Sequence, residues 1–169
     1  MTWKNYLREN DGENLNIYIV CVGKIKEKYI VDGMNEFLKR MKPFAKINIL
    51  ELKEYTKEES VNASIEKESE EILKTLNRID AYKIALDLNG KDFSSTEMAK
   101  HISNLAVNGI SSLCFVIGGS NGYNENVLKA VDLRLRFSRF TFPHQLIRLI
   151  LMEQIYRWFC TINNIKYHK

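Results

Sequence analysis

The C-terminal part of this chain combines residues that transfer protons with residues that bind anions. Residues 142–169 contain two of the three histidines of the protein, His144 and His168, together with Arg157 and Tyr167. An imidazole exchanges protons near neutral pH, a guanidinium group stabilises negative charge, and a phenol can donate a hydrogen bond. These four residues are therefore the candidate catalytic groups of the chain.

The spacing of these groups leaves two interpretations open. His144 and Arg148 are four residues apart and would share one face of a helix, and so would Glu153 and Arg157. For the second pair an ordinary ion pair is the simpler interpretation. The terminal Tyr-His pair, taken alone, is typical of a frayed chain end.

A glycine-rich loop is a second candidate for ligand binding. Residues 118–122 read Gly-Gly-Ser-Asn-Gly and follow an apolar, strand-like run. Glycine lets the backbone approach a ligand closely, but the loop matches neither the GxGxxG pattern nor a phosphate-binding loop with its lysine. A plain tight turn is an equally good explanation of this loop.

An aromatic run lies directly before Pro143, and its backbone could frame a flat ring. The alternative is the end of a core strand, which is the commoner origin of such a pattern. The run consists of Phe137, Ser138, Arg139, Phe140, Thr141 and Phe142.

The elements that must position these residues alternate between strands and helices. A Ser94–Glu97 capping box, an Asn89-Gly90 turn and a proline at the first position of the last helix mark three of the boundaries. Strands are expected at 16–22, 47–52, 82–87, 112–117 and within 133–140, and helices at 26–41, 60–76, 94–107, from about 125, and from Pro143.

This alternation predicts an α/β fold with a mostly parallel sheet flanked by helices. In such sheets ligands bind outside the carboxyl ends of the strands. That rule brings Leu86-Asp87, residues 117–119 and the residues after the fifth strand to one functional edge.

Length and composition indicate one globular domain over residues 16–169, preceded by a poorly ordered arm over residues 1–15. No apolar run reaches 18 residues, and the N-terminus lacks the apolar core of a signal peptide, so we expect a cytoplasmic protein that does not enter a membrane. Cys21, Cys114 and Cys160 show no CxxC spacing, which predicts buried free thiols and no metal site.

The net charge of +4 is unevenly distributed. Residues 131–169 contain seven basic residues and only Asp132 and Glu153 as acids, whereas residues 51–80 are acidic. A localised basic surface suits a polyanion such as nucleic acid. A solvated face with unrelated partners is the alternative.

Taken together, several motifs resemble one known family. They are Asn16–Tyr29 (NIYIVCVGKIKEKY), Leu86–Lys91 (LDLNGK), Phe115–Gly122 (FVIGGSNG), Phe142–Arg148 (FPHQLIR), Glu153–Arg157 (EQIYR) and Tyr167–Lys169 (YHK). In this order and spacing, the chain from residue 16 onward resembles the ribosomal RNA large subunit methyltransferase H family. These proteins are pseudouridine-N3 methyltransferases of the SPOUT class. The arm has no counterpart in the family, and Ser120-Asn121 stands where the family more often has proline and an acidic residue.

The resemblance implies a fold and a cofactor. The fold would be an α/β sheet whose C-terminal segment forms a deep trefoil knot, within a single SPOUT methyltransferase domain. The cofactor would be S-adenosyl-L-methionine, held in a bent form by the knot. Carried over position by position, its contacts would be Leu86, Gly118 and the run Phe137, Ser138, Arg139, Phe140, Thr141 and Phe142.

The resemblance also implies a reaction and partners. The family methylates N3 of a pseudouridine in helix 69 of 23S ribosomal RNA on the assembled ribosome. Its members act as homodimers. Because the N3 proton must leave, we expect His144 and His168 as bases, Arg157 as stabiliser of the ring anion and Tyr167 as an orienting donor.

The expected dimer contact is the apolar final helix, so that the tail of one subunit could complete the site of the other. The residues expected in that contact are Leu146, Leu149, Ile150, Ile155, Tyr156 and Phe159. Two functions compete with this assignment. One is a non-enzymatic RNA-binding module with the same fold, which would not bind the cofactor. The other is a SPOUT enzyme acting on transfer RNA ribose, against which the absence of an added RNA-binding domain argues.

Overall fold

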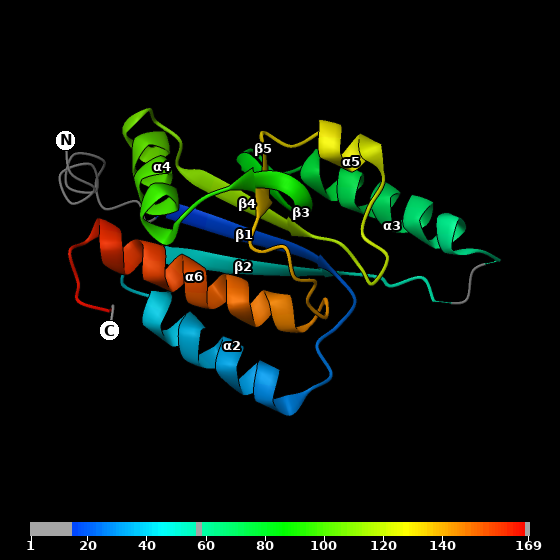
Figure 1. The fold of residues 1–169 in the computed structure, drawn as a ribbon, viewed down its shortest axis with the longest axis horizontal. Helices are drawn as coiled ribbons and strands as arrows, with labels where there is room; N and C mark the ends of the chain where they lie inside the picture. Colours follow the sequence, from blue (N-terminus) through cyan, green and yellow to red (C-terminus); the bar gives the residue numbers. More distant parts are fainter. Residues whose placement is uncertain (1–14, 57–58, 168–169) are drawn as a thin grey trace.

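The computed structural model describes residues 15–56 and 59–167, in which strands and helices alternate along the chain (Figure 1). The arm expected over residues 1–15 lies outside the described residues except for Leu15, which is buried in the first strand. The strands are β1 (Leu15–Val22), β2 (Ala45–Leu52), β3 (Tyr82–Asp92), β4 (Ser112–Ile117) and β5 (Leu133–Arg136). The helices are α2 (Lys28–Met41), α3 (Val61–Leu76), α4 (Ser95–Val107), α5 (Glu125–Lys129) and α6 (Leu146–Ile162).

The five strands form one sheet in the order β2-β1-β4-β3-β5, and every neighbouring pair is parallel. The predicted α/β fold with a parallel sheet is therefore confirmed. The central strands β1 and β4 are nearly continuous runs of apolar residues, as expected for strands covered on both faces.

Helices cover both faces of the sheet. On one face α6 packs between α2 and α4, and on the other face α3 packs against α5 (Figure 1). Two separate apolar clusters result, one containing Ile17, Phe115 and Phe159 and the other containing Val20, Val116 and Ile72. Because alternate residues of a strand point to opposite faces, Phe115 and Val116 fall into different clusters.

Local sequence signals explain several helix boundaries. The side chain of Ser60 caps α3 by accepting a hydrogen bond from Ala63 N, and Ser94 with Glu97 forms the predicted capping box at the start of α4. α6 can approach α2 closely because Gly33 has no side chain; a Cβ there would lie 2.8 Å from Leu149 Cδ1.

Two expected boundaries differ from the structure by three residues or more. The strand expected to end at Asp87 continues to Asp92, because residues 87–90 bulge out of the ladder and pairing with β5 resumes at Lys91. The last helix begins at Leu146 instead of Pro143, although the Pro143 carbonyl already accepts a hydrogen bond from Ile147 N at 3.0 Å. His144 thus lies in the turn before the helix.

The three cysteines are buried free thiols, as predicted. Burial raises the pKa of Cys21 to about 11 and that of Cys114 to about 12, so both stay protonated at neutral pH. Within residues 15–56 and 59–167, no helix is long and apolar enough to cross a membrane. The same residues contain no cluster of three or more His, Cys, Asp or Glu side chains suited to a metal ion.

Candidate functional site at the carboxyl ends of the strands

A cavity of about 380 Å³ lies at the carboxyl ends of β4 and β5 and beside the bulge in β3, at the sheet edge that the sequence indicates. We call it the strand-end cavity. Its volume is within the range of small-molecule sites. It is lined by residues 86–89 and 117–123, by Leu128, Leu135, Phe137, Ser138, Phe140, Thr141 and Phe142, and by His144 and Ile147.

The glycine-rich loop forms one wall of this cavity with its backbone. Gly122 has a φ of +78°, and a Cβ on Gly118 would lie 2.9 Å from the carbonyl carbon of Gly122. Any larger residue at 118 would force the loop open. Glycine is therefore required at position 118 for lack of space, whereas in an ordinary turn glycine is required for its backbone conformation.

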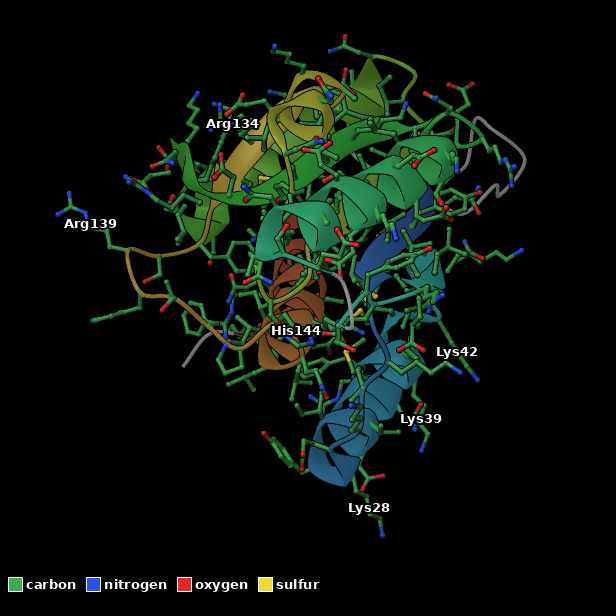
Figure 2. All side chains as sticks on the ribbon, turned by 90° about the vertical axis from the view of Figure 1, so that its right-hand side faces the viewer. Lys28, Lys39, Lys42, Arg134, Arg139 and His144 are labelled. Carbon is green, nitrogen blue, oxygen red and sulfur yellow. The ribbon has the colours of Figure 1, made fainter. Side chains whose placement is uncertain are left out.

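The aromatic run forms the opposite wall and is not a continuation of the core strand, since β5 ends at Arg136. Phe137 packs edge-on against Trp158 with ring centroids 6.3 Å apart, while Phe140 is 78% exposed at the cavity rim. Arg139 is exposed, does not line the cavity, and extends away from the body of the protein (Figure 2).

Asp87 and Tyr123, which the sequence motifs did not single out as ligand contacts, also line the cavity. The Tyr123 hydroxyl donates a hydrogen bond to the Leu86 carbonyl, and Asp87 accepts one from Arg134 Nε at 2.6 Å. Burial, with the nearby Asp87 charge, raises the pKa of Tyr123, so its hydroxyl remains a donor. No local pattern marks Tyr123, because its contact with Leu86 depends on packing.

His144 reaches the cavity from the turn before α6. Its Nδ1 is 3.2 Å from Ser120 Oγ in the glycine-rich loop, and its Nε2 is 3.9 Å from Glu54 Oε1 beyond β2. Burial lowers the pKa of His144; the charges of Arg148 and Lys26 act in the same direction, and Glu54 opposes them. The imidazole is therefore neutral at physiological pH and able to accept a proton.

Arg148 is completely buried one turn further along, where it joins α6 to the end of β1. It donates hydrogen bonds to the carbonyls of Val22 and Gly23, the latter at 2.9 Å, and its Nη1 lies 3.4 Å from Glu51 Oε1. Its role is structural, because it fixes the turn that carries His144.

The C-terminal end of α6 carries a different group of polar residues. Arg157 pairs with Glu153, as the spacing predicts, and its guanidinium carbon lies 4.9 Å from the centroid of the Tyr167 ring. Tyr167 also packs edge-on against Tyr156 at 4.8 Å. Burial, together with the Glu153 charge, raises the pKa of Tyr167 and keeps its hydroxyl protonated.

The basic surface expected from the charge count is smaller than predicted. Arg134 and Arg136 pair with Asp87 and Asp92, Arg157 pairs with Glu153, and Arg148 is buried. The exposed cations Lys28, Lys39 and Lys42 instead extend from α2 and its C-terminal end (Figure 2).

Comparison with known proteins agrees with this architecture. The sequence profile of the family described as "Predicted SPOUT methyltransferase" matches residues 15–168. A protein of Fusobacterium nucleatum named "Ribosomal RNA large subunit methyltransferase H" is 61% identical over 155 residues, covering 92% of this chain and 100% of the relative. Relatives of the same name from Clostridioides difficile and Desulforamulus reducens are 49% and 46% identical over 160 residues, covering 92% of this chain and 100% and 99% of their own lengths.

The chain belongs to the ribosomal RNA large subunit methyltransferase H family. The resemblance carried by the sequence motifs is thereby confirmed, and the protein is an enzyme of the SPOUT methyltransferase class.

In this methyltransferase the candidate residues form two separate groups. Of the expected cofactor contacts, all but Arg139 line the strand-end cavity, and so does His144. Arg157 and Tyr167 lie near the other end of α6. At a rise of about 1.5 Å per residue, roughly 17 Å of helix separates Leu146, which is two residues after His144, from Arg157. His168 lies outside the described residues.

The final helix of this methyltransferase is also less available for a dimer contact than expected. Ile155 and Phe159 are fully buried within the chain, so they cannot form an intersubunit surface. Leu146, Leu149, Ile150 and Tyr156 remain partly exposed.

Proposed function

We propose that this enzyme transfers a methyl group from S-adenosyl-L-methionine to N3 of a pseudouridine in helix 69 of 23S ribosomal RNA, on the assembled ribosome in the cytoplasm. The observation that carries the proposal is the strand-end cavity. Its walls include all but one of the residues that the family resemblance assigns to the cofactor, and the relatives named above carry ribosomal RNA methyltransferase names.

The composition of the cavity fits this cofactor. Leu86, Ile117 and Leu135 offer apolar surface for a flat ring, while the backbone of residues 118–122 and 137–142 offers hydrogen-bonding groups at its edges. Because Gly118 has no side chain, the cofactor can contact the backbone of the loop there. When bound, S-adenosyl-L-methionine supplies an electrophilic methyl group on a positively charged sulfur.

The chain's own residues would position the base and remove its proton. His144, neutral because of burial, accepts the imide proton. Arg157 stabilises the negative charge that develops on the ring, and the protonated hydroxyl of Tyr167 donates a hydrogen bond that orients it. The exposed lysines Lys28, Lys39 and Lys42 are suited to phosphate contacts.

We further propose that the active enzyme is a homodimer in which the tail of one subunit completes the site of the other. The separation of His144 from Arg157 along α6 supports this arrangement, because one chain does not bring both to the same cavity. Large apolar side chains at the cavity rim, Leu88, Phe140 and Phe142, are exposed and suited to coverage by a partner. The trefoil knot is part of the same proposal, with α6 following the loop 137–142.

The substrate is tested by primer extension on 23S ribosomal RNA from cells with and without this protein. N3 methylation blocks Watson–Crick pairing, so a stop in helix 69 that depends on the protein is expected. In vitro, ribosomes should accept a labelled methyl group, and free transfer RNA should not. Unchanged primer extension would refute the proposal.

The dimer is tested by mixing inactive subunits. His144→Ala and Arg157→Ala homodimers should both be inactive. If the site combines His144 of one subunit with Arg157 of the other, a mixed dimer regains one intact site. If both residues act within one subunit, no activity returns, and a fully active monomer would equally contradict the proposal.

A further inference from the structure

Three side chains from distant segments meet at the His144 edge of the strand-end cavity. Ser120 comes from the loop after β4, His144 from the turn before α6, and Glu54 from the segment after β2. The ring of His144 lies between the other two, with Nδ1 toward Ser120 Oγ at 3.2 Å and Nε2 toward Glu54 Oε1 at 3.9 Å. Ser120 itself lines the cavity.

The surroundings hold this arrangement in place. Gly23 has no side chain where a Cβ would lie 3.2 Å from Glu54 Oε2, so the carboxylate rests against the turn after β1. Arg148 holds the Gly23 carbonyl at 2.9 Å, and Gln145 Oε1 accepts a hydrogen bond from Lys26 N at 2.8 Å. The residues that follow His144 are thereby attached to the segment 23–26, against which Glu54 rests.

The Nε2 atom of His144 points to the role of Glu54. It is buried from solvent and has no hydrogen-bond partner among the described residues. Glu54 is the carboxylate that faces it, and a movement of about 1 Å would give a normal hydrogen bond. A proton on Nε2 would leave the lone pair on Nδ1, directed at Ser120.

We propose that Glu54 is a positioning residue that fixes the Nε2–H tautomer of His144, and that the Ser120 hydroxyl relays the substrate proton to Nδ1. The inference rests on the proposed function, because it assigns a path to the N3 proton. It also gives Ser120 a role at a position where the family more often has proline.

The relay conserves protons and electrons. The N3–H bond of the imide breaks, its proton passes to Ser120 Oγ, and the original hydroxyl proton of Ser120 passes to His144 Nδ1. The electron pair left on N3 would form the bond to the transferred methyl carbon while the bond between that carbon and the sulfonium sulfur breaks, and the electron pair of the broken bond would stay on sulfur as a neutral thioether. His144 becomes an imidazolium, whose charge the Glu54 carboxylate offsets, and it later releases its proton to water.

The charges around His144 make the role of Glu54 measurable. Arg148 on α6 and Lys26 before α2 lower the pKa of His144, as burial does, and Glu54 raises it. Removing the Glu54 charge therefore lowers this pKa further. The acid limb of the rate–pH profile would then move to lower pH, since His144 must be unprotonated to act.

The first test is nitrogen NMR of the His144 ring in the full chain, without cofactor or RNA. The wild type should show the Nε2–H tautomer. Glu54→Gln should lower the His144 pKa and mix the tautomers, whereas Glu70→Gln, the same change on the exposed face of α3, should alter neither. An Nδ1–H tautomer in the wild type, or an unaltered ring in Glu54→Gln, would overturn the proposal.

The second test is single-turnover methyl transfer at saturating cofactor. Because direct or water-mediated proton transfer remains possible, Ser120→Ala should slow the reaction about 10- to 100-fold, below the ~10²–10⁴-fold typical of a lost general base. Ser120→Thr, which keeps a hydroxyl, should restore most of the rate. Equal rates for Ser120→Ala and wild type would rule out proton transfer through Ser120. Failure of the wild type to methylate ribosomal RNA would instead refute the proposed function, and the NMR result would still decide the Glu54–His144 pairing.

Discussion

The two ends of α6 carry polar groups of similar type in very different settings. At the N-terminal end, Arg148 is fully buried and His144 borders a cavity. At the C-terminal end, Arg157 and Tyr167 are partly exposed and stack on one another. The first end is fixed by hydrogen bonds from Arg148 to backbone carbonyls at the end of β1. The second end is held by contacts among neighbouring side chains. Chemistry that needs a rigid geometry is therefore expected at the first end.

The largest difference between the two ends should appear in stability. Arg148→Met leaves the Val22 and Gly23 carbonyls and Glu51 without their partner. A buried carbonyl left without its donor costs about 1–3 kcal/mol, so the loss at the two carbonyls should lower the free energy of unfolding in urea by about 2–5 kcal/mol. Arg157→Met, at the partly exposed end, should cost less than about 1 kcal/mol. Equal losses of unfolding free energy in the two variants would contradict the proposed difference between the two ends of α6.

A smaller effect is expected on cofactor binding. Gly118→Ala places a Cβ 2.9 Å from the Gly122 backbone and must open the loop that lines the cavity. Calorimetry should show at least a tenfold weaker affinity for S-adenosyl-L-methionine, about 1.4 kcal/mol. Ser111→Ala, directly before β4 and at the opposite edge of the sheet from the cavity, is the control and should bind normally. Unchanged affinity in Gly118→Ala would mean that the cofactor does not bind in the strand-end cavity.

The third effect is a pH dependence of stability that belongs to the His144 end. The folded state lowers the pKa of His144 below 6.5, so below that pH the unfolded chain binds more protons. Stability is lost as pH falls from 6.5 through the lower folded-state pKa. His144→Gln should flatten this part of the curve in urea unfolding at a series of pH values. His101, partly buried against Tyr82 and Phe93, also has a lowered pKa and contributes to the remaining slope. An unaltered slope in His144→Gln would contradict the assignment.

The smallest effect is expected at the other end. Glu153→Gln weakens an i,i+4 pair with Arg157, which is worth about 0.3–0.5 kcal/mol. Thermal unfolding at low and high salt should show a small loss that salt reduces. A loss as large as that of Arg148→Met would mean that the C-terminal end is as tightly held as the N-terminal end.

Much of the fold could be predicted because the signals are local. Apolar runs marked β1 and β4, and Ser94 with Glu97 marked the start of α4. The bulge in β3 could not be predicted, because Asn89-Gly90 has the local chemistry of a turn and only pairing with β5 continues the strand. The sequence also located most of the cavity, since parallel strands bring their carboxyl ends to one edge.

The sequence by itself determined the order of the elements, the parallel sheet, the family and the loops at the functional edge, because periodicity and motif spacing are written along the chain. Only the tertiary structure decided which side chains meet. It buried Arg148 against β1, set Glu54 and Ser120 on either side of His144, and separated His144 from Arg157 and Tyr167 along α6. These contacts join residues up to about 126 positions apart in the chain, and packing alone brings such residues together.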